Sequence, residues 1–438
     1  MTEDRQLAAA DPLAYGENSL TSAEELGLDP DLSIPEVVRL DAPFAGIPEV
    51  VDTPRGLDRA AEILGSHEGP AAIDTERASG IRYGQRPFLV QIKRGDSPIL
   101  LVDPEAFEDL GPLDDALADA EWIVHASTQD LPSLRQTGMR PRSLFDTELA
   151  GRLAGLARVS LGAMTEEILG YRLAKEHSAA DWSQRPLPRP WLNYAALDVE
   201  LLRDLRDAIA EMLEGQGKLA WAEEEFEALC SAPDPAQDPE RWRKTKGLRA
   251  LRSPQQLTAL RNLWWERDNL AQAKDIAPKR LLGDAALVAA ARALPRSVPA
   301  LQRIPGFHTK LIKRESVRWT RAVQEALADP DPAPVHLPST GPPPVKAWAA
   351  KRPDAARALA AAREELLVRA ERLEVPQENL LTPDHLRRLC WEHAGAGAEE
   401  IEETLRELGA REWQIRNTVP LLVPAMAGRT SSDTAGTD

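Results

Sequence analysis

Acidic residues stand in three short motifs whose spacing could hold divalent cations. The first pair, Asp74 and Glu76, comes directly after the apolar run 71–73. On a strand, residues i and i+2 point to the same face, so both carboxylates would project together. Paired hard oxygen ligands suit a divalent cation. A solvated strand end is the alternative when this motif is considered alone.

Two further motifs supply the remaining candidate site residues. Asp130 follows the short apolar run 121–125 and a turn of small residues, near an expected helix start. A charge that interacts with the helix dipole is the alternative there. Tyr194 and Asp198 are four residues apart in a helical pattern, which places phenol and carboxylate on one face. The alternative is a tyrosine packed on the helix surface beside a solvent-facing aspartate.

The elements that must position these residues follow from the apolar pattern of residues 46–235. Short apolar runs at 71–73, 87–92, 99–102 and 121–125 predict strands, with 87–92 and 99–102 as a hairpin-like pair. Residues 161–169 and 191–213 have helical periodicity. Strand pairs followed by strand–helix alternation predict a mixed α/β sheet with flanking helices.

The strand signals end at about residue 240. Residues 240–329 and 345–425 each predict a small helical module, with helices at 254–275, 284–293, 298–302 and 310–328 in the first. The Pro-rich stretch 330–344 predicts a semi-rigid linker. Similar order and lengths suggest two diverged copies of one module, and a single large helical domain is the alternative. Residues 1–45, which are acidic, and 426–438 predict disordered tails.

The net charge of −17 argues against a nucleic-acid protein until its distribution is considered. Residues 1–237 carry 21 Lys and Arg against 44 Asp and Glu. Residues 238–329 carry 19 against 9, and residues 345–425 carry 12 against 14. A basic module inside an acidic chain is typical of a protein that binds a phosphate backbone. A solvated basic surface is the alternative.

Composition limits the compartment and the kinds of metal site. The chain contains no apolar run of about 18 residues, which excludes a membrane-spanning helix. The acidic N-terminus lacks the order of a signal peptide, so we expect a cytoplasmic protein. Cys230 and Cys390 are far apart, which fits a reducing compartment without a disulfide framework or a cysteine zinc site.

The order of the three motifs resembles the exonuclease superfamily named for its four acids, and Tyr194 marks its tyrosine subtype. Phe145-Asp146-Thr147, residues 173–175 and 181–187 and Trp242-Arg243 are similar to segments of the ribonuclease D family. The helical modules resemble HRDC (helicase and RNase D C-terminal) domains, including the turn 305–307. The resemblance spans roughly residues 55–425. Arg77 is a departure, since many members carry an apolar or aromatic residue there.

The resemblance implies a ribonuclease H-like, DnaQ-like exonuclease domain followed by all-α HRDC-like modules. It implies two divalent ions, Mg²⁺ or Mn²⁺, one held by Asp74, Glu76 and Asp198 and the other by Asp74 and Asp130. Tyr194 would orient or help to deprotonate the attacking water. The implied activity is 3′→5′ hydrolysis of RNA with a free 3′ end, tRNA precursors among the candidates, to nucleoside 5′-monophosphates.

Three other functions remain open at this point. A 3′→5′ exonuclease acting on DNA would use the same carboxylates. A catalytically silent RNA-binding adaptor would not need the complete acid set. A glycoside hydrolase using Asp74 and Glu76 is remote, because their i, i+2 spacing and the additional acids do not fit that chemistry. Lys175 could contact phosphate or be an ordinary surface lysine, and the basic module could hold the RNA body.

Overall fold

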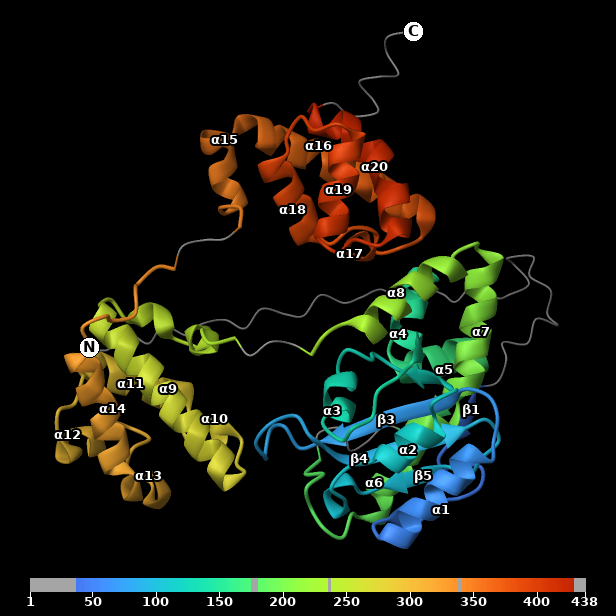
Figure 1. Cartoon of the computed structure of the whole chain (residues 1–438), viewed down its shortest axis with the longest axis horizontal. Helices are drawn as coiled ribbons and strands as arrows, with labels where there is room; N and C mark the ends of the chain where they lie inside the picture. Colours follow the sequence, from blue (N-terminus) through green and yellow to red (C-terminus); the bar gives the residue numbers. More distant parts are fainter. Residues whose placement is uncertain (1–36, 175–179, 235–237, 338–340, 429–438) are drawn as a thin grey trace, which may run out of the picture.

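A computed structural model of the chain describes residues 37–174, 180–234, 238–337 and 341–428. An α/β domain comes first, and two helical modules follow it along the chain (Figure 1). Lys175 and residues 1–36 and 429–438 lie outside the described residues. Within the described part of the chain, none of the helices has both the length and the apolar character needed to cross a membrane.

A six-stranded mixed sheet forms the centre of the α/β domain, which confirms the predicted fold class. Its strands, in spatial order, are β2 (Val50–Val51), β5 (Leu100–Val102), β4 (Pro87–Arg94), β3 (Ala71–Arg77), β6 (Glu121–Val124) and β7 (Ser143–Asp146). β3 is antiparallel to β4 and parallel to β6, and β4 is antiparallel to β5. The predicted hairpin-like pair is therefore present. β3 is central and continues beyond the apolar run 71–73, so it carries the first acidic motif.

Helices pack around this sheet and bury its strands. They are α1 (Pro54–Gly65), α2 (Gly111–Ala116), α3 (Leu131–Arg135), α4 (Thr147–Leu153), α5 (Leu161–Leu169), α6 (Arg189–Glu200), α7 (Leu202–Gly215) and α8 (Leu219–Ser231), with a 3₁₀ turn at Pro104–Ala106. α6 contacts β3 and β4, and α8 contacts β7. The helical pattern over 191–213 is present but does not form one continuous helix. It is two helices that meet at Leu201, a residue with non-helical backbone angles and a side chain buried in a small core.

The boundary of the acidic tail at residue 45 is also corrected by the structure. β1 (Val38–Leu40) pairs in parallel with β8 (Tyr171–Leu173). Leu40 is buried with Leu173, Leu197 and Leu201, and this burial holds the strand against the α/β domain. An apolar segment this short inside an acidic stretch gives too weak a pattern to be recognised from sequence.

The two helical modules share a long helix followed by a four-residue helix and a ten-residue helix, and they differ in the elements before and after these three. The first contains η3 (Arg241–Lys244), η4 (Leu248–Ala250), α9 (Pro254–Lys274), α10 (Pro278–Leu281), α11 (Asp284–Ala293), α12 (Val298–Gln302), α13 (Lys310–Arg314) and α14 (Ser316–Ala328). The second contains η5 (Val345–Ala347), α15 (Trp348–Lys351), α16 (Pro353–Leu373), α17 (Gln377–Leu380), α18 (Pro383–Glu392), α19 (Ala398–Glu407) and α20 (Glu412–Met426). α9 and α16 have equal length and both end at a left-handed residue, Asp275 or Glu374. The helix expected over 310–328 is interrupted at Glu315, between α13 and α14.

The first helical module docks on the loop that follows β3. The guanidinium of Arg86 pairs with Asp275 at 2.8 Å, and the Tyr83 hydroxyl donates to Asp268 at 2.9 Å. The backbone amide of Ala277 donates to the carbonyl of Ile81 at 2.8 Å. This module therefore fixes the loop that leads from the first acidic motif to β4.

The second helical module packs on α8 of the α/β domain. Trp413 stacks on Trp221 with ring centroids 5.0 Å apart, and its backbone amide donates to Glu224 at 2.8 Å. Arg416 pairs with the same glutamate at 2.6 Å. The buried side chains of this module belong to the same apolar core as those of the α/β domain.

Candidate active site

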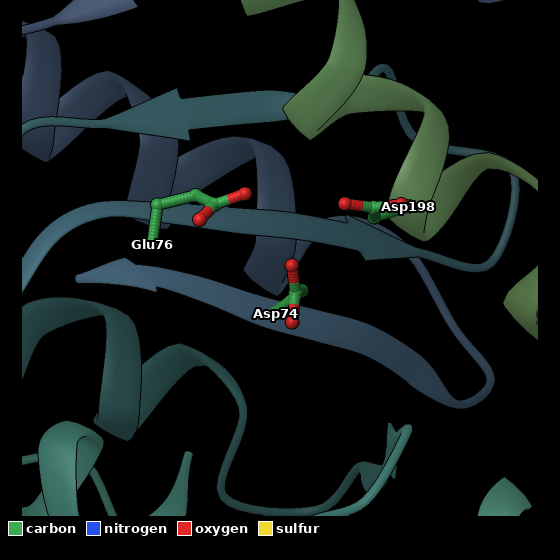
Figure 2. A group of neighbouring side chains, drawn as sticks. All are labelled: Asp74, Glu76 and Asp198. Carbon is green, nitrogen blue, oxygen red and sulfur yellow. The ribbon is translucent and has the colours of Figure 1, made fainter. Parts of the chain in front are cut away.

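Three carboxylates converge between β3 and α6. Asp74 and Glu76 project from one face of β3, and Asp198 reaches them from α6 (Figure 2). One oxygen from each residue lies within 4.8 Å of the oxygens from the other two. Strand alternation explains the first pair, and the helical continuation of Tyr194 to Asp198 explains the third member. We call these three residues the carboxylate cluster.

Burial and mutual repulsion raise the pKa of every member of the carboxylate cluster. Loss of water is the largest cause for each residue, and the neighbouring carboxylates add to it. The pKa of Asp74 lies well above its usual range. That of Glu76 rises to about 10 and that of Asp198 to about 7. Ionising all three carboxylates together is therefore unfavourable unless a nearby positive charge compensates for it.

Asp130 lies beside the carboxylate cluster rather than in it. Its charge raises the pKa values of Asp74, Glu76 and Asp198, so it is an electrostatic neighbour of all three. Its Oδ1 accepts a hydrogen bond from the Thr75 hydroxyl at 2.7 Å. Although Asp130 begins α3, its carboxylate is directed to β3 instead of capping the helix. The sequence alternative of a simple helix-terminal charge does not describe this position.

Tyr194 joins the site through the carboxylate that follows it by one helical turn. Its hydroxyl is hydrogen-bonded to Asp198, and its ring packs 6.4 Å from the ring of Trp182. Burial and the surrounding acids raise the pKa of the phenol above its usual range. A phenol in this environment holds its proton, so it can orient a water molecule but is a poor base.

The segment 181–187, noted above for its sequence similarity, is held against the sheet by Arg185. The guanidinium contacts the carboxylate of Asp103 at 2.5 and 2.6 Å and the carbonyl of Phe88 at 2.8 Å. These contacts keep Trp182 fully buried beside Tyr194. Arg185 thereby supports the ring that packs against the site tyrosine.

Asp146 supports the turn that delivers Asp130. Its carboxylate accepts hydrogen bonds from the amides of Ala126 and Ser127 and from the Ser127 hydroxyl, at 3.2, 2.8 and 2.7 Å. It also caps α4 through the amides of Glu148 and Leu149. Ala126 has a φ of 56°, a left-handed conformation that costs about 1–2 kcal/mol outside glycine. The buried Asp146 stabilises this turn against that cost.

The carboxylate cluster fits a divalent cation by the chemistry of its donors. Hard oxygen atoms from three side chains within one small volume are the ligands that Mg²⁺ and Mn²⁺ take. The raised pKa values show that the folded protein gathers these carboxylates at an electrostatic cost. A bound cation would remove that cost.

Comparisons with known proteins agree with this fold. Residues 48–214 match the 3′–5′ exonuclease family, residues 256–323 the HRDC domain, and residues 341–426 the 3′ to 5′ exonuclease C-terminal domain. The chain is 34% identical over 302 residues to ribonuclease D of Gluconacetobacter diazotrophicus, covering 66% of this chain and 75% of that protein.

Solved structures of other proteins share the fold of this chain. A protein from Bifidobacterium adolescentis is 37% identical, with a TM-score of 0.82 over 89% of this chain and all of that one. Escherichia coli RNase D has the same fold at 24% identity, with a TM-score of 0.62 over 82% of this chain and 98% of that one.

The fold and the gathered acids define a 3′–5′ exonuclease, a class of nuclease that depends on divalent metal ions. Within this class, the chain belongs to the ribonuclease D family. The resemblance first noted in the three acidic motifs is confirmed. The second helical module corresponds to the C-terminal domain that matches residues 341–426.

Proposed function

We propose that this chain hydrolyses RNA from a free 3′ end and releases nucleoside 5′-monophosphates. The observation that carries the proposal is the convergence of Asp74, Glu76 and Asp198 on one point of an exonuclease fold. Membership of the ribonuclease D family supports RNA over DNA as the substrate. The E. coli relative is described as an exoribonuclease involved in structured RNA processing, which makes structured RNAs, tRNA precursors among them, the first substrates to test.

The proposed catalytic residues are Asp74, Glu76, Asp130, Tyr194 and Asp198. Asp74, Glu76 and Asp198 would hold one divalent cation, and Asp74 with Asp130 a second, with Mg²⁺ or Mn²⁺ as the ion. Bound ions of this kind lower the pKa of water and stabilise the charge that develops on a leaving oxygen. The Tyr194 hydroxyl, kept protonated by its surroundings, would hold the attacking water in line with the scissile phosphate.

A substrate path leads from the acids to the basic module through two adjoining cavities. A cavity of about 680 Å³ includes Glu76 and Arg77 from β3 and Gln129 from the turn before α3. A second cavity of about 490 Å³ is lined by Lys244, Trp264 and Lys279 of the first helical module, among others. Ser79 and Gly80 line both cavities, so a strand of RNA could pass from one to the other.

The second cavity suits a phosphate chain. Arg241, Lys244, Arg267 and Lys279 line it together with one acid, Asp284. Arg267 pairs with Asp284 at 2.7 Å and Arg241 with Asp268 at 2.5 Å, whereas Lys244, which pairs with Asp238 at 3.1 Å, has an exposed side chain. The two lysines are therefore the better candidates for contact with phosphate. Arg241 lies over the rings of both Trp264 and Trp265, at 4.8 and 4.7 Å from their centroids. Its guanidinium thus occupies ring surface on which a base would otherwise stack. We therefore propose phosphate contact as the main role of this cavity.

The double substitution Lys244→Gln and Lys279→Gln should weaken RNA binding and flatten its salt dependence. Each phosphate contact with a single strand contributes about 0.7 to the log–log slope, so losing both should reduce the slope by about 1.4. The measurement is RNA affinity between about 50 and 200 mM salt, with Ca²⁺ in place of Mg²⁺ to limit cleavage.

A matched control removes two positive charges from α1, by Arg55→Gln and Arg59→Gln. Both residues lie outside the two cavities. If the slope of log affinity against log salt concentration falls equally in the two double variants, the second cavity has no special role in RNA binding. Charge removal is a cleaner test than deleting residues 240–438, because deletion would expose the apolar surface that α8 shares with the second helical module.

Substrate class is tested with RNA and DNA of matched sequence, each carrying a free 3′ end. We expect Mg²⁺-dependent shortening of the RNA at a kcat/KM at least about tenfold above that for DNA, a difference of about 1.4 kcal/mol in transition-state binding. If DNA is cleaved as fast as RNA or faster, the proposal of RNA as the preferred substrate is wrong.

A further inference from the structure

Alternate residues of β3 contact different acids of the site. Asp74 and Glu76 point toward Asp198 (Figure 2). The intervening residue, Thr75, and the following one, Arg77, both contact Asp130. Thr75 and Arg77 therefore give Asp130 partners of its own, while its charge still acts on Asp74, Glu76 and Asp198.

Arg77 is built into its contact with Asp130. Its Nη2 lies 3.4 Å from Asp130 Oδ1, the same oxygen that accepts from Thr75. Its Nη1 donates to the backbone carbonyl of Gln129, the residue before Asp130. The register of β3 against β4 shifts between Glu76 and Arg77, a bulge of the kind that redirects a side chain.

This ion pair differs from an ordinary surface salt bridge in its burial. The side chain of Asp130 is 6% exposed and that of Arg77 is 23% exposed. A largely buried pair is screened little by solvent or salt, so its partners hold each other more firmly than exposed ions do. A cation that binds Asp130 therefore meets a positive charge that the protein already supplies.

We propose that Arg77 is the resident counter-ion of Asp130 and competes with the divalent cation that this carboxylate would hold. The inference rests on the proposed function, in which Asp130 belongs to the second cation site. It implies ordered binding, in which the carboxylate cluster takes the first ion at low concentration. The second ion binds only when its concentration is high enough to displace the guanidinium.

Arg77 also lines the cavity through which RNA would approach the acids. A guanidinium displaced from Asp130 remains in that cavity, where a phosphate of the substrate is a suitable new partner. Arg77 is thus a positioning residue for the proposed reaction, acting through Asp130. Its effect should be visible in metal binding without any turnover.

The test is a Mn²⁺ titration of the full chain, with free Mn²⁺ followed by electron paramagnetic resonance. Wild type, Arg77→Gln and Arg77→Lys are compared, because glutamine can keep a hydrogen bond to the Gln129 carbonyl without the charge. We expect one tighter and one weaker binding step in wild type. In Arg77→Gln the dissociation constant of the weaker step should fall about tenfold, with the tighter step unchanged and Arg77→Lys close to wild type.

An unchanged or weakened second step in a folded Arg77→Gln protein would overturn the inference. Circular dichroism checks the fold, and Arg77→Lys provides a second folded comparison if the glutamine variant is unstable. If the dissociation constant of the weaker binding step is the same in Arg77→Lys as in Arg77→Gln, the charge of Arg77 does not matter and the inference is rejected. Asp130→Asn separates this inference from the proposed function. If two steps persist in Asp130→Asn, the assignment of Asp130 to the second site is wrong, whatever Arg77 does.

Discussion

Replacing Asp74 with asparagine should reduce RNA hydrolysis by about a thousandfold or more while the fold remains intact. The pKa of Asp74 is raised by burial and then by the charges of both Asp130 and Asp198, so Asp74 is close to both and is the candidate ligand common to the two cations. Loss of one electrostatic group from a preorganised site commonly costs a hundredfold to about a thousandfold, and a shared ligand should cost at least as much. The measurement is kcat on a short single-stranded RNA at saturating Mg²⁺.

The same substitution should leave the metal-free protein at least as stable as wild type. Asparagine has nearly the shape of aspartate and removes one charge from a group of buried acids that repel one another. Thermal unfolding in EDTA measures this directly. Asp58→Asn, an exposed acid on α1, is the matched control and should keep wild-type activity. Full activity in a folded Asp74→Asn protein would reject the proposed site.

The stability of the metal-free protein should fall as pH rises from about 5 to 8. The pKa values of Asp130, Asp198 and Glu76 are raised to about 6, 7 and 10, mainly by burial, whereas an unfolded chain has carboxyl pKa values near 4. At pH values above the unfolded pKa and below the raised folded pKa values, the folded state binds more protons than the unfolded state. The free energy of unfolding then decreases with increasing pH, and the loss is complete only above the folded pKa values.

Divalent ions should reverse this trend, because cations bind the deprotonated carboxylates. The difference in melting temperature between samples with Mg²⁺ and with EDTA should therefore widen as pH rises. Hydrolysis at low Mg²⁺ should increase over the same range. The substitution Asp74→Asn should flatten both trends. If this difference in melting temperature stays constant or becomes smaller toward pH 8, the acids do not bind the ion as proposed.

The acidic motifs could be recognised from sequence because their geometry is local. The i, i+2 spacing of Asp74 and Glu76 and the i, i+4 spacing of Tyr194 and Asp198 each place two side chains on one face. The structure brings three of the four expected carboxylates into one group. Asp130 is not part of this group. Its position depends on the turn before α3 and on contacts with β3, which the spacing of the motifs along the sequence does not show.

Other parts of the structure depend on contacts between distant residues and leave little trace in the sequence. The role of Arg77 is not evident from its motif, since its partners are Gln129 and Asp130. Asp146 both supports the turn before Asp130 and caps α4, through contacts that its place in the sequence does not show. The docking of the first helical module through Arg86 and Asp275 could not be predicted, because either residue alone looks like an ordinary surface charge.

The sequence predicts helix limits well where the apolar pattern is clear and poorly where it continues through a break. α5, α11 and α12 have the predicted limits, and Ser297 caps the last of them by accepting from the amide of Ala300. The breaks at Leu201 and Glu315 were missed, since the helical periodicity continues through both positions. Tertiary packing, for example the burial of Leu201 beside β1 and β8, decides where these helices end.

The most direct test of the central claim is the digestion of a 5′-labelled single-stranded RNA by metal-free protein to which Mg²⁺ is then added. The account predicts no cleavage before Mg²⁺ and, after it, a ladder that shortens one nucleotide at a time from the 3′ end. The released products should be nucleoside 5′-monophosphates. Cleavage in EDTA, immediate release of the labelled 5′ nucleotide, or products that carry a 3′-phosphate would contradict the account.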